Sequence, residues 1–220
     1  MFRKLIDQLK KLTTGDGERF DPATLNDPVA LNTEWSPLKR GGASFCTRKL
    51  VQVSPLRYEF RASWGAKAFY LIFLVVGLGL LIASLFQVIE SEKIFTEDVI
   101  GLGAVGLIFT LAGGLMFYFG TKPVVFDKQY ECFWTGRIPT DELMYATANE
   151  LLMPFKEIYA IQLISELVSG DKNSYYSYEM NLVSQEGVRT NVVDHGKLDQ
   201  IHADARTLSE FLEVPIWDGI

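Results

Sequence analysis

The chain has 220 residues and a net charge of −6, which is enough for one ordinary domain or two small ones. Aromatic residues make up 13% of it, which argues against disorder, and its two cysteines, Cys46 and Cys132, argue against a disulfide scaffold. Residues 68–89 and 99–121 carry no charge, and each stretch can cross about 30 Å of hydrocarbon as a helix, which argues against a purely soluble protein.

The N-terminal segment, residues 1–13, is predicted to form a basic amphipathic helix, because Phe2, Leu5, Ile6 and Leu9 recur at helical spacing. Its apolar side suits either an anionic membrane leaflet or the protein's own cytoplasmic domain, and both interpretations stay open. Residues 14–65 are then expected to form a cytoplasmic connection that includes two strands, at 45–53 and 56–61.

Residues 66–121 are predicted to form a transmembrane hairpin whose spans, about 68–89 and 99–121, are joined by a short acidic loop. Helices in lipid approach closely at small residues, so we expect helix packing at two stripes of i, i+4 spacing. These stripes are Gly79 and Ala83 in the first span, and Gly106, Thr110 and Gly114 in the second. An anchoring hairpin is the main interpretation, and a contact between copies or a conduction path are its alternatives.

Basic side chains flank both outer ends of the hairpin, whereas the connecting loop contains only Lys93. The flanking residues are Arg57, Arg61 and Lys67 before it and Lys122 and Lys128 after it. Because an excess of Lys and Arg marks cytoplasmic segments, we expect both termini in the cytoplasm, two spans, and an inner or plasma membrane location. Reduced thiols at both cysteines fit that compartment.

The C-terminal part, residues 122–220, is predicted to contain antiparallel strands followed by one amphipathic helix. The strands are expected at 123–127, 131–135, 158–168, 176–182 and 188–193. Alternation predicts that Tyr176 and Tyr178 are buried together and that Tyr175 points outward, either as part of a partner surface or as an ordinary surface aromatic. The helix is expected to end before Pro215.

Consecutive hairpins closed by a C-terminal helix resemble the pleckstrin-homology-like (PH-like) domains of bacterial membrane proteins. The residues that carry the likeness are Val124–Asp127, Glu131–Trp134, Met153–Ile158, Tyr178–Val183 and Asp204–Leu212. The resemblance implies a membrane α+β fold, with the hairpin joined to a cytoplasmic antiparallel sheet or partial barrel, and a non-catalytic binding or assembly module in the bacterial inner membrane. The insertion at 136–150 and the strands before the spans depart from that pattern, and no basic pocket supports phosphoinositide binding.

Motifs of phosphate-binding loops, zinc proteases and serine hydrolases are missing from the sequence. Asp194, His195 and Gly196 are expected to cap the last helix, and His202 to lie on its solvated face. We therefore expect no catalytic residue, no cofactor and no metal. The acidic C-terminal part also argues against nucleic acid as a partner.

The sequence favours a membrane-anchored protein that presents an interaction domain to a protein partner or to another copy. The alternatives are a small accessory subunit of a larger membrane complex and, less favoured, a membrane-bound enzyme. Because a hairpin returns the chain to its starting side, the strands on its two sides should emerge close together. We expect seven strands in one barrel-like sheet, against the rival of a separate strand pair on the membrane surface.

Overall fold

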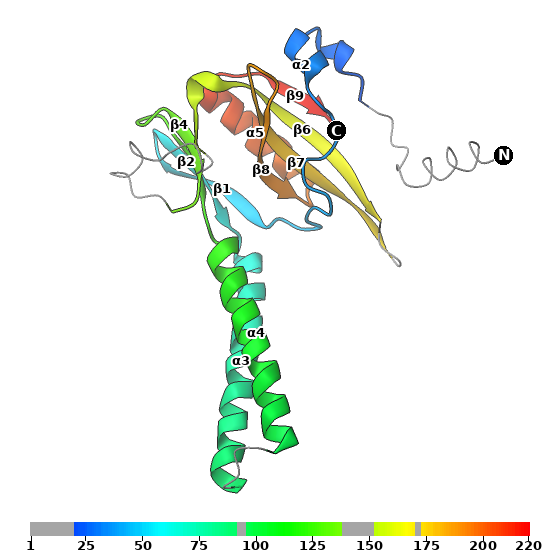
Figure 1. The fold of residues 1–220 in the computed structure, drawn as a ribbon. Coiled ribbons are helices and arrows are strands. Elements are labelled where there is room, and N and C mark those ends of the chain that lie inside the picture. Colours follow the sequence, from blue (N-terminus) through cyan, green and yellow to red (C-terminus); the bar gives the residue numbers. More distant parts are fainter. Residues whose placement is uncertain (1–19, 92–95, 138–151, 170–172) are drawn as a thin grey trace, which may run out of the picture. The chain divides into compact units, whose positions relative to one another are not determined.

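A computed structural model describes residues 20–91, 96–137, 152–169 and 173–220 (Figure 1). The expected N-terminal helix, Lys93 and almost all of the insertion at 136–150 lie outside the described residues. The chain divides into two compact units, one formed by Met1–Phe45 with Pro154–Ile220 and the other by Cys46–Met153. Each unit is described by itself.

The second unit contains the two apolar helices, α3 (Trp64–Ser91) and α4 (Glu97–Gly120). Ser63 Oγ accepts a hydrogen bond from Ala66 N at the start of α3, and Thr96 caps α4 by accepting from Val99 N. Proline follows α4 at position 123, where it cannot continue a helix. Both helices are long and apolar enough to span a membrane, as expected from the sequence.

The same unit holds a five-stranded sheet in the order β1-β2-β3-β4-β5. Its strands are Arg48–Ser54, Arg57–Ala62, Val124–Asp127, Cys132–Thr135 and Leu152–Pro154. Strand β2 enters the hairpin and β3 leaves it, and the two pair antiparallel with Phe60 opposite Val124 and Tyr58 opposite Phe126. The prediction that the flanking strands emerge side by side is confirmed, and the separate strand pair is wrong.

The first unit contains a four-stranded sheet in the order β8-β7-β6-β9. Strands β6 (Ile158–Ser169), β7 (Ser174–Ser184) and β8 (Arg189–His195) are antiparallel neighbours, whereas β9 (Ile216–Gly219) pairs parallel to β6. A tight turn joins β7 to β8, and Gly187 within it has the positive φ of 79° that favours glycine. Helix α5 (Leu198–Leu212) lies between β8 and β9 in the chain.

Short N-terminal elements complete this unit: η1 (Pro22–Leu25), α2 (Pro28–Asn32) and, before β6, η2 (Phe155–Glu157). Ala30 of α2 is fully buried in a cluster with Ala160, Val183 and Trp217. Asp27 caps α2 and also accepts a hydrogen bond from the Tyr159 hydroxyl at 3.0 Å. Part of the segment predicted to be a connection therefore contributes to the core of the first unit.

The expectation of one seven-stranded, barrel-like sheet is wrong, because the described strands form two open sheets of five and four strands. The sequence pattern located most strands but carried no information on which strands share a sheet. The coarser prediction, a helix hairpin with antiparallel β-structure and a C-terminal helix, agrees with the structure.

Candidate functional site

The interface between α3 and α4 is built at glycines that bring the two backbones together. A Cβ atom built on Gly77 would lie 2.4 Å from Thr110 N, and one on Gly113 would lie 2.5 Å from Leu74 N. One on Gly106 would lie 2.9 Å from Leu81 N. Real Cβ atoms do not come so close, so side chains at these positions would push the helices apart.

The observed contact between the helices lies on a different face of α3 from the expected stripe. Gly106 and Thr110 lie at the helix contact, but Gly79 and Gly114 have open space around the position of a Cβ atom, and Ala83 is exposed. Ser84, rather than Ala83, faces α4, where its hydroxyl donates to the Val99 carbonyl at 2.9 Å. The contact therefore follows Gly77 and Ser84 on α3, and Gly106, Thr110 and Gly113 on α4.

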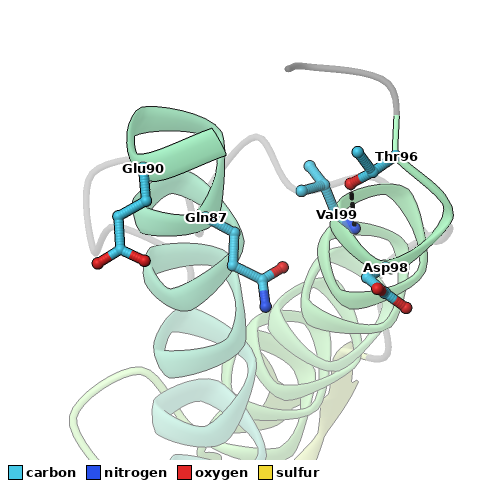
Figure 2. A pocket seen from close by; sticks show the side chains of 5 residues that line it. All are labelled: Gln87, Glu90, Thr96, Asp98 and Val99. Atoms are coloured by element: carbon cyan, nitrogen blue, oxygen red, sulfur yellow. Dashed lines mark hydrogen bonds between the residues drawn. The ribbon is translucent and has the colours of Figure 1, made fainter. Parts of the chain in front are cut away.

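A pocket of about 370 Å³ lies between the end of α3 and the start of α4. Its lining residues are Gln87, Glu90, Thr96, Asp98 and Val99 (Figure 2). Figure 2 shows the carboxylates of Glu90 and Asp98 directed to opposite sides rather than toward one point. The described lining residues thus do not form the convergent polar group that catalysis or cation binding requires.

In the first unit, residues 34–45 form a strap across the polar side of β6 and β7. The buried Glu179 carboxylate accepts hydrogen bonds from the backbone N–H groups of Leu38 at 3.0 Å and Lys39 at 3.1 Å. Glu166 accepts from Gly41 N at 3.1 Å, and the Tyr175 hydroxyl donates to the Gly42 carbonyl at 2.9 Å. Backbone N–H groups that would suit an anionic ligand are therefore occupied by the protein's own carboxylates.

The strap reverses the orientation predicted for the tyrosines of β7. Tyr175 is half-buried by its bond to the strap, whereas Tyr176 is 52% exposed and stacks on Tyr178 with ring centroids 6.5 Å apart. Leu167, opposite Tyr176 on β6, is also exposed. The exposed apolar face of this hairpin therefore belongs to Tyr176 and Leu167, and Tyr175 faces the strap.

Two histidine–aspartate pairs lie among the described residues of the first unit. His195 is fully buried, with its Nε2 atom 3.2 Å from Asp204 Oδ2 of α5, while His202 Nε2 lies 3.0 Å from Asp218 Oδ2 near the surface. The prediction that the residues at 194–196 cap α5 is corrected, because Lys197 occupies the N-cap and makes no side-chain cap bond. In the described parts of the chain, no three His, Cys, Asp or Glu side chains are grouped to hold a metal ion.

The pKa values of Cys132 and Asp194 are both raised. Burial, with the nearby charge of Asp127, raises the pKa of the Cys132 thiol, which keeps it protonated and weakly nucleophilic. Burial also raises the pKa of Asp194, and the charges of Glu179 and Glu166 act in the same direction against the hydrogen bond from Asn191.

Comparison with known proteins adds no assignment: no protein-family model, no curated protein and no solved structure matches this chain. The candidate functional surfaces are therefore those that the geometry itself defines. They are the apolar exterior of the hairpin and the exposed Tyr176 face of the first unit.

Proposed function

We propose that this chain is a non-catalytic integral membrane protein whose helix hairpin anchors a cytoplasmic interaction domain at the bacterial inner membrane. The observation that carries the proposal is the exposure of large apolar side chains along both helices. Val75 is 65% exposed, Ile89 64% and Ile108 63%. In water such a surface would be unfavourable by about 25 cal/mol for each Å² of apolar area, and a bilayer removes that cost.

The orientation in this proposal has both termini in the cytoplasm, supported by the excess of Lys and Arg at the strand-proximal end of the hairpin over the single lysine of its loop. The antiparallel run of β6, β7 and β8 followed by α5 supports the PH-like character of the interaction domain. Its proposed partner surface is the face of Leu167 and Tyr176, which replaces Tyr175.

Extraction of native membranes at alkaline pH tests the anchor. The full chain should stay in the membrane pellet and be released only by detergent, and release by alkali alone would contradict anchoring. For orientation, a cysteine at Asp98 in a variant lacking Cys46 and Cys132 should react with an impermeant maleimide added outside. A cysteine at Arg206 should react only after lysis, and the opposite pattern would reverse the topology.

A second candidate, an accessory subunit of a larger membrane complex, is favoured by one observation. Gly79 and Ala83 form an i, i+4 pair on the outer side of α3, where a further helix would find open space. A cysteine at Gly79 should then cross-link to a membrane partner in stoichiometric yield, whereas one at Leu85, which is 60% exposed and about 120° around the helix from Gly79, serves as a control. Equal, low yields at both positions would favour the simple anchor.

A further inference from the structure

Three cationic side chains gather where the hairpin meets the five-stranded sheet. Lys67 lies in the first turn of α3, Lys122 just beyond α4, and Arg137 just beyond β4. Lys67 Nζ lies 5.3 Å from the centroid of the Trp64 ring, and Trp64 is 82% exposed. Within the described residues, none of the three forms an ion pair with a carboxylate.

Two of these cations surround a single aromatic ring. Lys122 Nζ lies 5.6 Å from the centroid of Tyr118, and Arg137 Cζ lies 5.8 Å from the same centroid. Arg137 is held there by a hydrogen bond from Nη2 to Thr121 Oγ1 at 2.6 Å. The face of the ring attracts each cation, and the two positive charges together create a positive potential that favours a nearby anion.

The helix dipole accounts for only part of this arrangement. Cations stabilise the C-terminus of α4, and Arg48 donates to the Lys122 carbonyl there. Lys67, however, lies at the N-terminus of α3, where the dipole disfavours a positive charge and the first turn contains no acidic residue. A Cβ on Gly120 would touch the Tyr70 ring, so Lys67, about one turn before Tyr70, is level with the residues that follow Gly120.

An apolar stripe leads away from the Lys122–Arg137 pair along α4. Tyr118, Leu115 and Leu111 recur at i, i−3 and i−7, and they are 57%, 57% and 55% exposed. A headgroup phosphate at the cations would place its acyl chains along this stripe. A free phosphate ion would make no use of it.

We propose that Lys122 and Arg137 form a binding site for the phosphate of an anionic phospholipid, whose acyl chains lie along Leu115 and Leu111. This inference rests on the proposed membrane anchoring, and it specifies which lipid class occupies the cytoplasmic leaflet beside α4. Lys67 and the exposed Trp64 ring add positive potential and an interfacial contact at the same level.

The test uses the purified full chain in a mild neutral detergent. Apparent affinities are obtained from the rise in Tm on titration with dioctanoyl-phosphatidylglycerol or dioctanoyl-phosphatidylcholine, which have the same acyl chains. The parent is compared with Lys122→Gln/Arg137→Gln. The matched control is Lys156→Gln/Arg206→Gln, which removes one lysine and one arginine from exposed positions of the first unit.

We expect the parent to prefer phosphatidylglycerol and the site variant to lose about fivefold in affinity for each charge removed, with binding of phosphatidylcholine unchanged. The control should keep the preference, and Lys122→Arg should retain most of it. Equal affinity of the parent for the two lipids would overturn the inference, even if the site variant fails to fold. So would an undiminished preference in the site variant, or an equal effect of inorganic phosphate. Alkaline extraction of membranes tests the anchor separately, so failure of one proposal is distinguishable from failure of the other.

Discussion

At the scale of single residues, the neighbouring glycines Gly113 and Gly114 give the sharpest test of the hairpin. A Cβ at Gly113 would meet Leu74 N at 2.5 Å, whereas one at Gly114 meets nothing within 4 Å. Gly113→Ala should destabilise the hairpin by about 1–3 kcal/mol through overpacking. Gly114→Ala should be neutral or stabilising by up to about 1 kcal/mol, because alanine favours the helix. Thermal unfolding in detergent measures both, and equal effects would contradict the observed interface.

The sequence located both spans because an uncharged stretch of more than about 20 residues has few other interpretations. It did not fix which face of each helix makes contact. One face of α3 has the small residues Gly77 and Ser84, and another has Gly79 and Ala83. Both faces suit close packing, and only the structure of the two packed helices shows which one contacts α4. Of the predicted stripe residues, Gly106 and Thr110 therefore lie at the observed contact, whereas Gly79, Ala83 and Gly114 do not.

Asp194 should make the stability of the first unit depend on pH. Because its pKa is raised in the folded chain, the folded state holds this proton more tightly than the unfolded state. Its contribution is then favourable at low pH and is lost as the pH rises from the ordinary value of 3.8 through the raised one. Asp194→Asn should gain stability relative to the parent as pH increases from 4 to 7, measured by denaturant unfolding. A difference that does not change with pH would contradict this.

At the scale of elements, one of the contacts that hold the strap on β7 is a buried carboxylate. Glu179 is 4% exposed and accepts the backbone N–H groups of Leu38 and Lys39. Glu179→Gln replaces one acceptor oxygen by an NH₂ group, which cannot accept a hydrogen bond from these backbone N–H groups. The substitution should lower the free energy of unfolding by about 1.5–3 kcal/mol. Hydrogen exchange at Leu38 and Lys39 should accelerate more than exchange in β8. Unchanged protection of these two amides would show that the strap is held by other contacts.

The same strap explains why the orientation of β7 could not be predicted. A two-residue alternation identifies the strand but takes the more apolar face as the buried one. Here Glu179 is covered by Leu38, which lies 141 positions away in the sequence, so the polar face is also buried. His195 and Asp204 are a similar case, since their burial depends on the packing of α5 against β8.

At the scale of the whole molecule, the hairpin is an insertion between two adjacent strands of one sheet. The principle that a helix hairpin returns to its starting side was sufficient to predict that β2 and β3 emerge close together, and in the structure they pair. It was not sufficient to assign the later strands, because β6 to β9 form a second sheet with a parallel pair that no local pattern signals. Long-range pairing of this kind is decided by burial across both sheet faces rather than by adjacent residues.

The insertion predicts that the hairpin can be removed without loss of the sheet. Phe60 lies opposite Val124, so extending the register by two residues places Ala62 opposite Lys122. Replacing residues 63–121 by Asn-Gly should close these strands with a two-residue turn. The variant, begun at residue 20 to exclude the basic N-terminal segment, should be soluble without detergent and unfold cooperatively.

A second deletion provides the control for this experiment. Replacing residues 62–121 by the same Asn-Gly shifts the register by one residue and would turn the side chains of one strand to the wrong face. It should aggregate or unfold at a clearly lower temperature in a thermal scan followed by circular dichroism. If both deletions fold equally well, the pairing of β2 with β3 does not organise this unit. If the in-register deletion alone fails, the helices contribute to the sheet's stability and are more than an anchor.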